Sequence, residues 1–151
     1  MITSHDRTMD IAELTSGHEV EAAALWPDVG LTRPWNDTVA DDRRALSGPT
    51  STVLGTTEEG VLVGTAMVGS DGHRGWIHCL ALSPHRPRTG IGAALVPSAS
   101  RWLAQCGAPK ILLMVRDGDP GLIESYDRCG FARESVRVTS RWIEGKDSAP
   151  D

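Results

Sequence analysis

The sequence has 151 residues, of which 40% are hydrophobic and 23% charged. This is the size and composition of one ordinary domain with a single buried core. The formal net charge of -5 argues against a nucleic-acid-binding protein, which needs a basic face, and is compatible with a cationic substrate.

Targeting and redox features predict a cytoplasmic protein without membrane association. The N-terminus contains no apolar run that could serve as a signal peptide, and the longest apolar run, 111–115, is too short to span a bilayer. Cys79, Cys106 and Cys129 are far apart and lack the spacing of metal ligands. We therefore expect free thiols in a reducing compartment and no metal site.

The first half of the chain follows a flexible start, 1–8. Its predicted elements are a strand over 9–14, helices over 16–26 and 38–46, and strands over 51–56, 61–70 and 76–82. Apolar residues at helical spacing indicate the first helix, and Asn36-Asp37 and Gly48-Pro49 are signals that begin and end the second. Strand 76–82 is apolar on both faces and is expected at the centre of a sheet.

The second half continues with alternating helices and strands. Its predicted elements are a helix ending at Cys106-Gly107, a strand over 110–115, a helix over 119–129, strands over 131–134 and 136–142, and a flexible tail over 144–151. This order predicts one mixed α/β (α+β) domain over 9–143. It should have a central, mostly antiparallel sheet of six to seven strands with helices on both faces. Strands such as Val136–Trp142 are candidates for pairing between the subunits of a homodimer.

A loop with two glycines, Gly90-Ile91-Gly92, leads from the buried strand into a helix. Unpaired N–H groups at a helix N-terminus bind phosphate, and glycines let the backbone come close to it. A dinucleotide-binding fingerprint is excluded, because Leu95 replaces its third glycine and the glycines lie about eight residues beyond the strand end, whereas that fingerprint needs them immediately after the strand. An ordinary loop with solvated Arg86 and Arg88 stays an alternative.

The segment Tyr126–Phe131 contains the only tyrosine and the only phenylalanine of the chain. Taken alone, it is explained by an aromatic pair that packs in the core. A functional role for this segment is indicated only when it is considered together with the other motifs of the chain.

Three motifs together resemble the GNAT superfamily of acetyl-CoA-dependent N-acetyltransferases. They are the L-x-L-x-P strand end at Leu80–Pro84, the R/Q-x-x-G-x-G/A loop at 87–92, and Y-x-x-x-G-F at Tyr126–Phe131. The element order of residues 9–143 is also similar to that superfamily. The segments Arg33-Pro34-Trp35-Asn36-Asp37 and Asp71-Gly72-His73-Arg74-Gly75 resemble a branch of small bacterial members.

The resemblance implies acetyl-CoA as a cosubstrate and no metal. The strand end Leu80, Ala81 and Leu82 would bind the pantetheine arm, with the Leu82 N–H polarising the thioester carbonyl. The pyrophosphate would be bound by the backbone amides of Arg88, Thr89, Gly90, Ile91, Gly92 and Ala93. Asp119 stands where the family often has an asparagine that contacts the cofactor arm.

Two prolines depart from expectation. Pro87 occupies the first position of the loop motif, where the family has arginine or glutamine, so a charge-assisted contact of roughly 1.5–3 kcal/mol is lost unless Arg86 or Arg88 replaces it. Pro97 lies inside the following helix, where proline costs about 3 kcal/mol.

The implied reaction is transfer of the acetyl group to a primary amine by direct attack in a ternary complex. Tyr126 would be the general acid for the departing thiolate. His78 is a candidate base, with Asp71 and His73 as others. A satisfied core histidine and a water chain are the alternatives. The candidates for the acceptor pocket are Arg33, Trp35, Asn36, Asp71 and His73, although a helix-capping turn with a packed tryptophan also explains Arg33–Asn36.

Two other functions stay open. The first is a non-catalytic or weakly catalytic acyl-CoA sensor, which Pro87 and the uncertain base favour. The second is an interaction domain that uses Trp26 and Trp35 as a partner surface. The acceptor amine, small molecule or peptide, is not specified by the sequence, because its pocket is built from loops.

Overall fold

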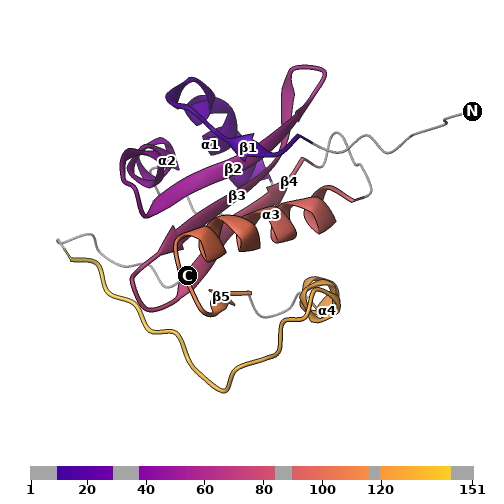
Figure 1. The fold of residues 1–151 in the computed structure, drawn as a ribbon. Helices are drawn as coiled ribbons and strands as arrows, with labels where there is room; N and C mark the ends of the chain where they lie inside the picture. Colours follow the sequence, from indigo (N-terminus) through magenta and orange to yellow (C-terminus); the bar gives the residue numbers. More distant parts are fainter. Residues whose placement is uncertain (1–9, 29–37, 84–89, 116–119, 144–151) are drawn as a thin grey trace, which may run out of the picture. The chain divides into compact units, whose positions relative to one another are not determined.

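The computed structural model describes residues 10–28, 38–83, 90–115 and 120–143 (Figure 1). The chain forms two compact units, Met1–Met114 and Val115–Asp151. The first contains β1 (Ala12–Glu13), a 3-10 helix η1 (Ser16–His18), α1 (Glu19–Asp28), α2 (Thr38–Ser47), β2 (Ser51–Glu58), β3 (Val61–Ser70), β4 (Gly75–Leu82), α3 (Ile91–Gln105) and β5 (Ile111–Leu113). The second contains α4 (Pro120–Arg128).

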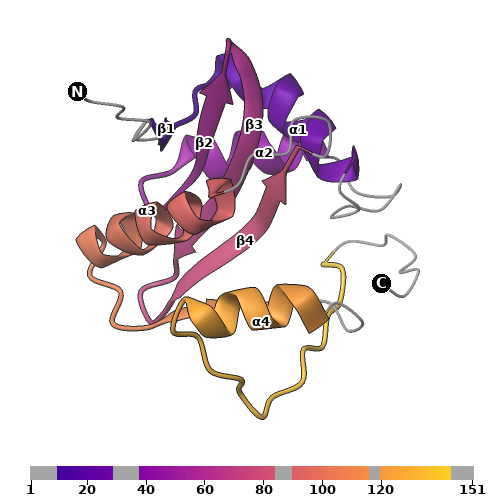
Figure 2. The same ribbon diagram turned by 90° about the vertical axis from the view of Figure 1, so that its right-hand side faces the viewer.

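The strands of the first unit form one sheet in the order β1-β2-β3-β4-β5. The first four strands pair antiparallel, whereas β5 is parallel to β4. A parallel pair needs a crossover, and α3 supplies it. Helices α1 and α2 lie on one face of the sheet and α3 lies on the other (Figures 1 and 2). The predicted class, a mixed and mostly antiparallel sheet with helices on both faces, is confirmed.

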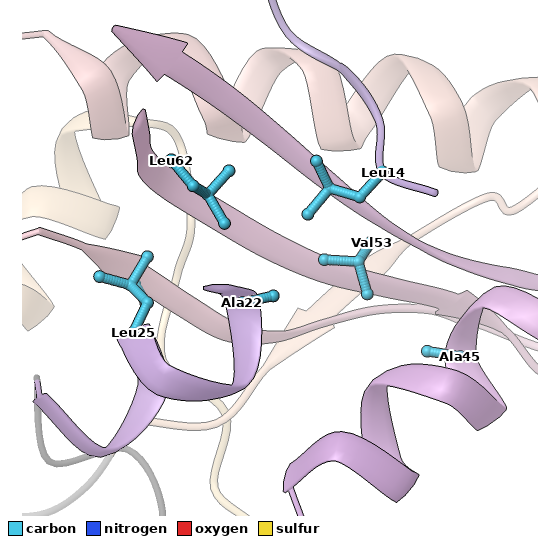
Figure 3. Packing of buried hydrophobic residues seen from close by; sticks show 7 residues of the cluster. Leu14, Ala22, Leu25, Ala45, Val53 and Leu62 are labelled. Carbon is cyan, nitrogen blue, oxygen red and sulfur yellow. The ribbon is translucent and has the colours of Figure 1, made fainter. Parts of the chain in front are cut away.

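The core on the α1/α2 face is a cluster of small and branched apolar residues (Figure 3). Its members are Leu14, Ala22, Leu25, Ala45, Val53, Leu62 and Ala81. Alanines from both helices let the backbones approach the strands closely, and Leu46 and Met67 pack at the edge of this cluster. Burial of such side chains is the main stabilising contribution to the fold.

Helix α3 packs on the opposite face through Ile91, Leu95 and Leu103, each at most 2% exposed. Two strand glycines make this approach close. A Cβ added to Gly64 would lie 2.6 Å from Ile91 Cγ2, and one added to Gly75 would lie 3.1 Å from Leu103 Cδ1. Glycines in neighbouring strands thus receive both ends of the helix, and α3 runs back from the end of β4 toward its start.

Local signals fix the turns. Glu59 and Gly60 both have positive φ, 51° and 77°, and Glu58 pairs with Val61. This is the two-residue hairpin that matches strand twist. Helix α3 ends in a Schellman motif, in which Ala108 N–H donates to the Leu103 carbonyl and Gly107 adopts a φ of 85°.

Pro97 is tolerated inside α3 because it lies on the solvent side. The residue is exposed, and α3 continues past it to Gln105. Proline cannot donate to the carbonyl of Ala93, which is itself exposed, so water can bond the freed carbonyl oxygen.

The two final strands predicted over 131–134 and 136–142 are not formed. Residues 132–143 are exposed and have no regular secondary structure, and Val136 and Val138 are 75% and 67% exposed. Alternating apolar residues form a strand only where a neighbouring strand accepts their backbone hydrogen bonds. No described strand does so for this segment.

Replacing Gly64 with alanine should destabilise the fold. The added methyl would meet Ile91 and Leu95 at 2.6 and 3.1 Å, and such overpacking costs about 1–3 kcal/mol. Chemical denaturation measures the change. Gly48→Ala is the matched control, because its Cβ meets nothing within 4 Å. Equal stability of the two variants would show that α3 does not pack this closely on β3.

Candidate active site

A β-bulge in β4 organises the candidate site. Between the pairs Met67↔His78 and Thr65↔Ala81, β3 has one residue and β4 has two, Cys79 and Leu80. An extra residue reverses the alternation of side chains beyond it. His78 therefore faces the α1/α2 side, where its partner Met67 packs, whereas Leu82 faces α3.

The parallel strands β4 and β5 part just before this bulge. Their pairing ends at Ile77↔Leu113, while β4 continues to Leu82. The Ser83 N–H donates to the Val63 carbonyl at 2.8 Å. Because antiparallel residues alternate in direction, the Leu82 N–H points away from β3, toward the β5 side. Such an edge can bind an extended chain that carries amide groups.

The N-terminus of α3 lies beside this strand end. Gly90 is its N-cap, with a left-handed φ of 99° that favours glycine, and no side chain caps the helix. The first N–H groups, from Ile91 to Ala93, are therefore suited to an anion. A Cβ on Gly92 would lie 3.6 Å from Leu82 Cδ1. The strand end and the helix N-terminus thus form one continuous site.

The remaining predicted cofactor residues of the first unit contribute mainly backbone. Ile91 and Ala81 have buried side chains, 2% and 1% exposed, so Ile91 can offer a ligand only its backbone N–H. The backbone groups of Ala81 point toward β3, because Ala81 pairs with Thr65 and precedes the outward Leu82. Leu80 belongs to the bulge and is half-buried. Recognition of the cofactor by these backbone groups stays a prediction.

Asp71 holds the turn between β3 and β4. Its Oδ1 accepts hydrogen bonds from the N–H groups of His73 and Arg74 at 2.8 and 2.7 Å, and its Oδ2 accepts one from Trp76 Nε1 at 3.1 Å. These bonds lower the pKa of Asp71 to about 2, so the carboxylate stays ionised. The turn lies at the opposite end of β4 from Leu82, roughly 20 Å away along an extended strand.

His78 lies between these two ends of β4. Its imidazole stacks on the Trp76 indole, with ring centroids 5.8 Å apart and planes 5° from parallel. Burial lowers the pKa of His78 below the ordinary value of 6.5, so the ring is neutral at pH 7 and can accept a proton. Sequence reasoning singled out Asp71 and His78 but missed Trp76, although residues two apart in a strand share a face.

In the second unit, Tyr126 belongs to the C-terminal cap of α4. Phe131 N–H donates to the Tyr126 carbonyl at 3.1 Å, Gly130 has a φ of 90°, and the two aromatic rings meet edge to face. This is a Schellman motif with its hydrophobic contact, which explains the spacing Y-x-x-x-G-F. Burial first, and then nearby Cys129, raise the pKa of Tyr126 to about 12. The phenol therefore stays protonated.

Several predicted site residues lie outside the described part of the chain. They are Arg33, Trp35, Asn36, Arg88, Thr89 and Asp119, together with Arg86 and Pro87 of the loop. Their predicted roles stay predictions.

Comparison with known proteins places the chain in a family. The sequence profile of the acetyltransferase (GNAT) family matches residues 18–131. An acetyltransferase of Pectobacterium atrosepticum is 34% identical over 124 residues, which cover 82% of this chain and 88% of that protein. One of Yersinia enterocolitica is 32% identical over 136 residues, covering 89% and 96%. The chain belongs to the acetyltransferase (GNAT) family.

Solved structures share the fold of this GNAT protein. An aminoglycoside N-acetyltransferase in complex with CoA superposes with a TM-score of 0.77 at 15% identity, covering 94% of this chain and 99% of the other. A putative acetyltransferase from Agrobacterium tumefaciens gives 0.74 at 20% identity, covering 89% and 100%. At such identities the likeness shows the fold alone.

The described part of this acetyltransferase contains neither a metal-binding cluster nor a helix that could cross a membrane. Within the described residues, no group of three or more His, Cys, Asp or Glu side chains could hold a metal ion. No helix in that part of the chain has the length and apolar character needed to cross a membrane.

The carboxyl of Asp71 should titrate near pH 2 rather than at its ordinary value of 3.8, as followed by its carboxyl carbon NMR signal. Because the folded pKa is lowered, ionised Asp71 stabilises the fold above the ordinary pKa, and this contribution is lost as the pH falls through about 2. Thermal unfolding of Asp71→Asn should lack that acid dependence. Titration at the ordinary value would mean that the turn bonds are not formed in solution.

Proposed function

We propose that this acetyltransferase transfers the acetyl group of acetyl-CoA to a primary amine by direct attack in a ternary complex. The observation that carries the proposal is the outward Leu82 N–H at the end of β4, next to the uncapped N-terminus of α3. The solved structure with CoA bound to a protein of the same fold supports it.

The strand end and the helix suit the two chemically different parts of acetyl-CoA. The β5 side of β4 from His78 to Leu82 can receive the extended, amide-bearing pantetheine arm. The amides of Gly90, Ile91, Gly92 and Ala93 can receive the pyrophosphate, together with Arg88 and Thr89. Bound acetyl-CoA supplies a thioester-activated acetyl group. The Leu82 N–H then stabilises negative charge on its carbonyl oxygen, and Asp119 contacts the cofactor arm.

His78 is assigned as the base. The acceptor is an ammonium ion at pH 7 and must lose a proton before its nitrogen attacks. Imidazole of lowered pKa is neutral and accepts that proton. The neutral nitrogen attacks the acetyl carbonyl carbon, and the C–S bond breaks once the C–N bond has formed. His78 lies on the α1/α2 side of β4, as its pairing with Met67 indicates.

Tyr126 is assigned as the acid that protonates the departing thiolate. Its phenol is in the donor form because its pKa is about 12. A phenol of that pKa is a weaker acid than a thiol of ordinary pKa about 8.5. Full transfer of its proton to the sulfur is therefore unfavourable by itself, so the phenol first donates a hydrogen bond that stabilises the thiolate as the C–S bond breaks. The proton then follows as the phenol oxygen takes up the second proton lost by the acceptor nitrogen.

The acceptor is proposed to be a small molecule that carries a primary amine. An aminoglycoside acetyltransferase of the same fold, with a TM-score of 0.74, has been solved in complex with sisomicin. Arg33, Trp35, Asn36 and His73 stay the candidates for contacts to the acceptor, and the negative charge of Asp71 would attract its cationic groups.

The first test is Tyr126→Phe, which removes only the hydroxyl and keeps the ring contact with Phe131. The rate of amine-dependent thiol release from acetyl-CoA should fall on the order of 10²-fold. The Kd for acetyl-CoA, measured by calorimetry, should change little. An unchanged rate would remove Tyr126 from the mechanism, and failure of the wild type to bind acetyl-CoA would overturn the proposed function.

His78→Gln should lower kcat on the order of 10²-fold or more, while leaving the Kd for acetyl-CoA unchanged. In the wild type, kcat/KM should rise with pH as His78 loses its proton, with a midpoint below the ordinary 6.5. The variant should lack this step. A step that persists in His78→Gln would belong to another group. Tight binding without turnover over a broad panel of amines would favour the sensor function instead.

A further inference from the structure

We propose that Trp76 is a positioning residue for catalysis, because its indole, held by Asp71, fixes the plane of the His78 imidazole. The proposal rests on the proposed function, in which His78 is the base. It gives the turn residue Asp71 an indirect part in the reaction, different from a direct contact with the acceptor.

The first contact is between the turn and the indole. Asp71 Oδ1 is fixed by the backbone N–H groups of His73 and Arg74, and Oδ2 accepts the Trp76 Nε1–H at 3.1 Å. The guanidinium of Arg74 donates to the His73 carbonyl at 3.0 Å. The carboxylate is thus oriented by its own turn, and the indole is oriented by the carboxylate.

The second contact is between the indole and the imidazole. Residues 76 and 78 share a face of β4, and their rings lie 5° from parallel at a centroid separation of 5.8 Å. Offset parallel rings at this separation attract each other. The stack therefore favours one orientation of the His78 ring.

His78 needs such support because of where β5 ends. Pairing of β4 with β5 stops at Ile77↔Leu113, so His78 is the first residue of β4 without a neighbour in that strand. Within the described residues, Trp76 is the ring that contacts His78, and no hydrogen-bond partner of the imidazole is found there. A base must lie within hydrogen-bond reach of the proton that it removes, and small misplacements of reacting groups cost up to about 10²-fold in rate.

A double-mutant cycle tests the proposal. Trp76→Leu should lower kcat about 10- to 100-fold with little change in the Kd for acetyl-CoA, and Trp76→Phe, which keeps a ring, should restore most of the rate. In the His78→Gln background, Trp76→Leu should have no further effect, because its role passes through His78. Trp102→Leu is the matched control, since Trp102 also donates its indole N–H to a carboxylate, Glu13 at 3.3 Å, but lies in α3.

Proton NMR gives a readout that does not depend on activity. The ring current of the indole should shift the imidazole carbon-bound protons of His78 upfield, and Trp76→Leu should abolish that shift. Asp71→Asn keeps an oxygen for the two backbone N–H groups but offers the indole an NH₂ group. It should reduce both the shift and kcat. Thermal unfolding identifies any variant that has lost its fold.

The outcomes separate the two proposals. An equal loss of kcat from Trp76→Leu in the wild-type and His78→Gln backgrounds would overturn the positioning role while leaving acetyl transfer intact. Absence of the ring-current shift in the wild type would also overturn it. An unchanged kcat in His78→Gln would remove His78 as the base and the positioning role with it, whereas the acetyl-CoA binding test would still decide the proposed function.

Discussion

The bulge at Cys79-Leu80 is the constraint on which the candidate site depends. One extra residue in β4 changes which face each later side chain occupies. Without it, His78 and Leu82 would share a face. With it, the imidazole lies on the α1/α2 side, and the Leu82 side chain packs toward α3. The bulge also follows the point where β5 stops pairing with β4. The β5 side of β4 is therefore unpaired by β5 in the same segment in which the side chains change faces.

Close packing of α3 places the N–H groups of a helix N-terminus beside that strand edge. Gly64 lets Ile91 and Leu95 approach β3 at distances that any side chain would prevent. The N-terminus of the helix is thereby brought next to Leu82, and its uncapped amides lie beside an outward strand amide, which is the arrangement that we propose for binding the pyrophosphate. In this GNAT protein, a glycine in the middle of a strand therefore has a consequence at the end of the neighbouring strand.

Two predicted functional residues also have structural roles, and the two kinds of role are compatible. Asp71 closes the β3–β4 turn, and through Trp76 it reaches His78. Tyr126 contributes the carbonyl and the ring of a Schellman cap with Gly130 and Phe131. A side chain whose backbone is fixed in this way loses little further freedom when it acts on a substrate, which is the value of preorganisation.

Sequence alone determined the order of helices and strands as far as α4 and the glycines at the start of α3, because apolar periodicity and capping signals are local. The parallel pairing of β5 with β4 was decided by the tertiary structure. The bulge was not visible in the sequence, since alternation in Trp76–Leu82 is hidden where both faces are apolar. Alternating apolar residues also predicted strands over 131–134 and 136–142, which the described structure does not form. A strand needs a neighbouring strand to pair with, and that neighbour is determined by the tertiary structure. The stack of Trp76 on His78 and the contact of Gly92 with Leu82 were likewise decided by tertiary structure, since each depends on the register of a strand or the docking of a helix.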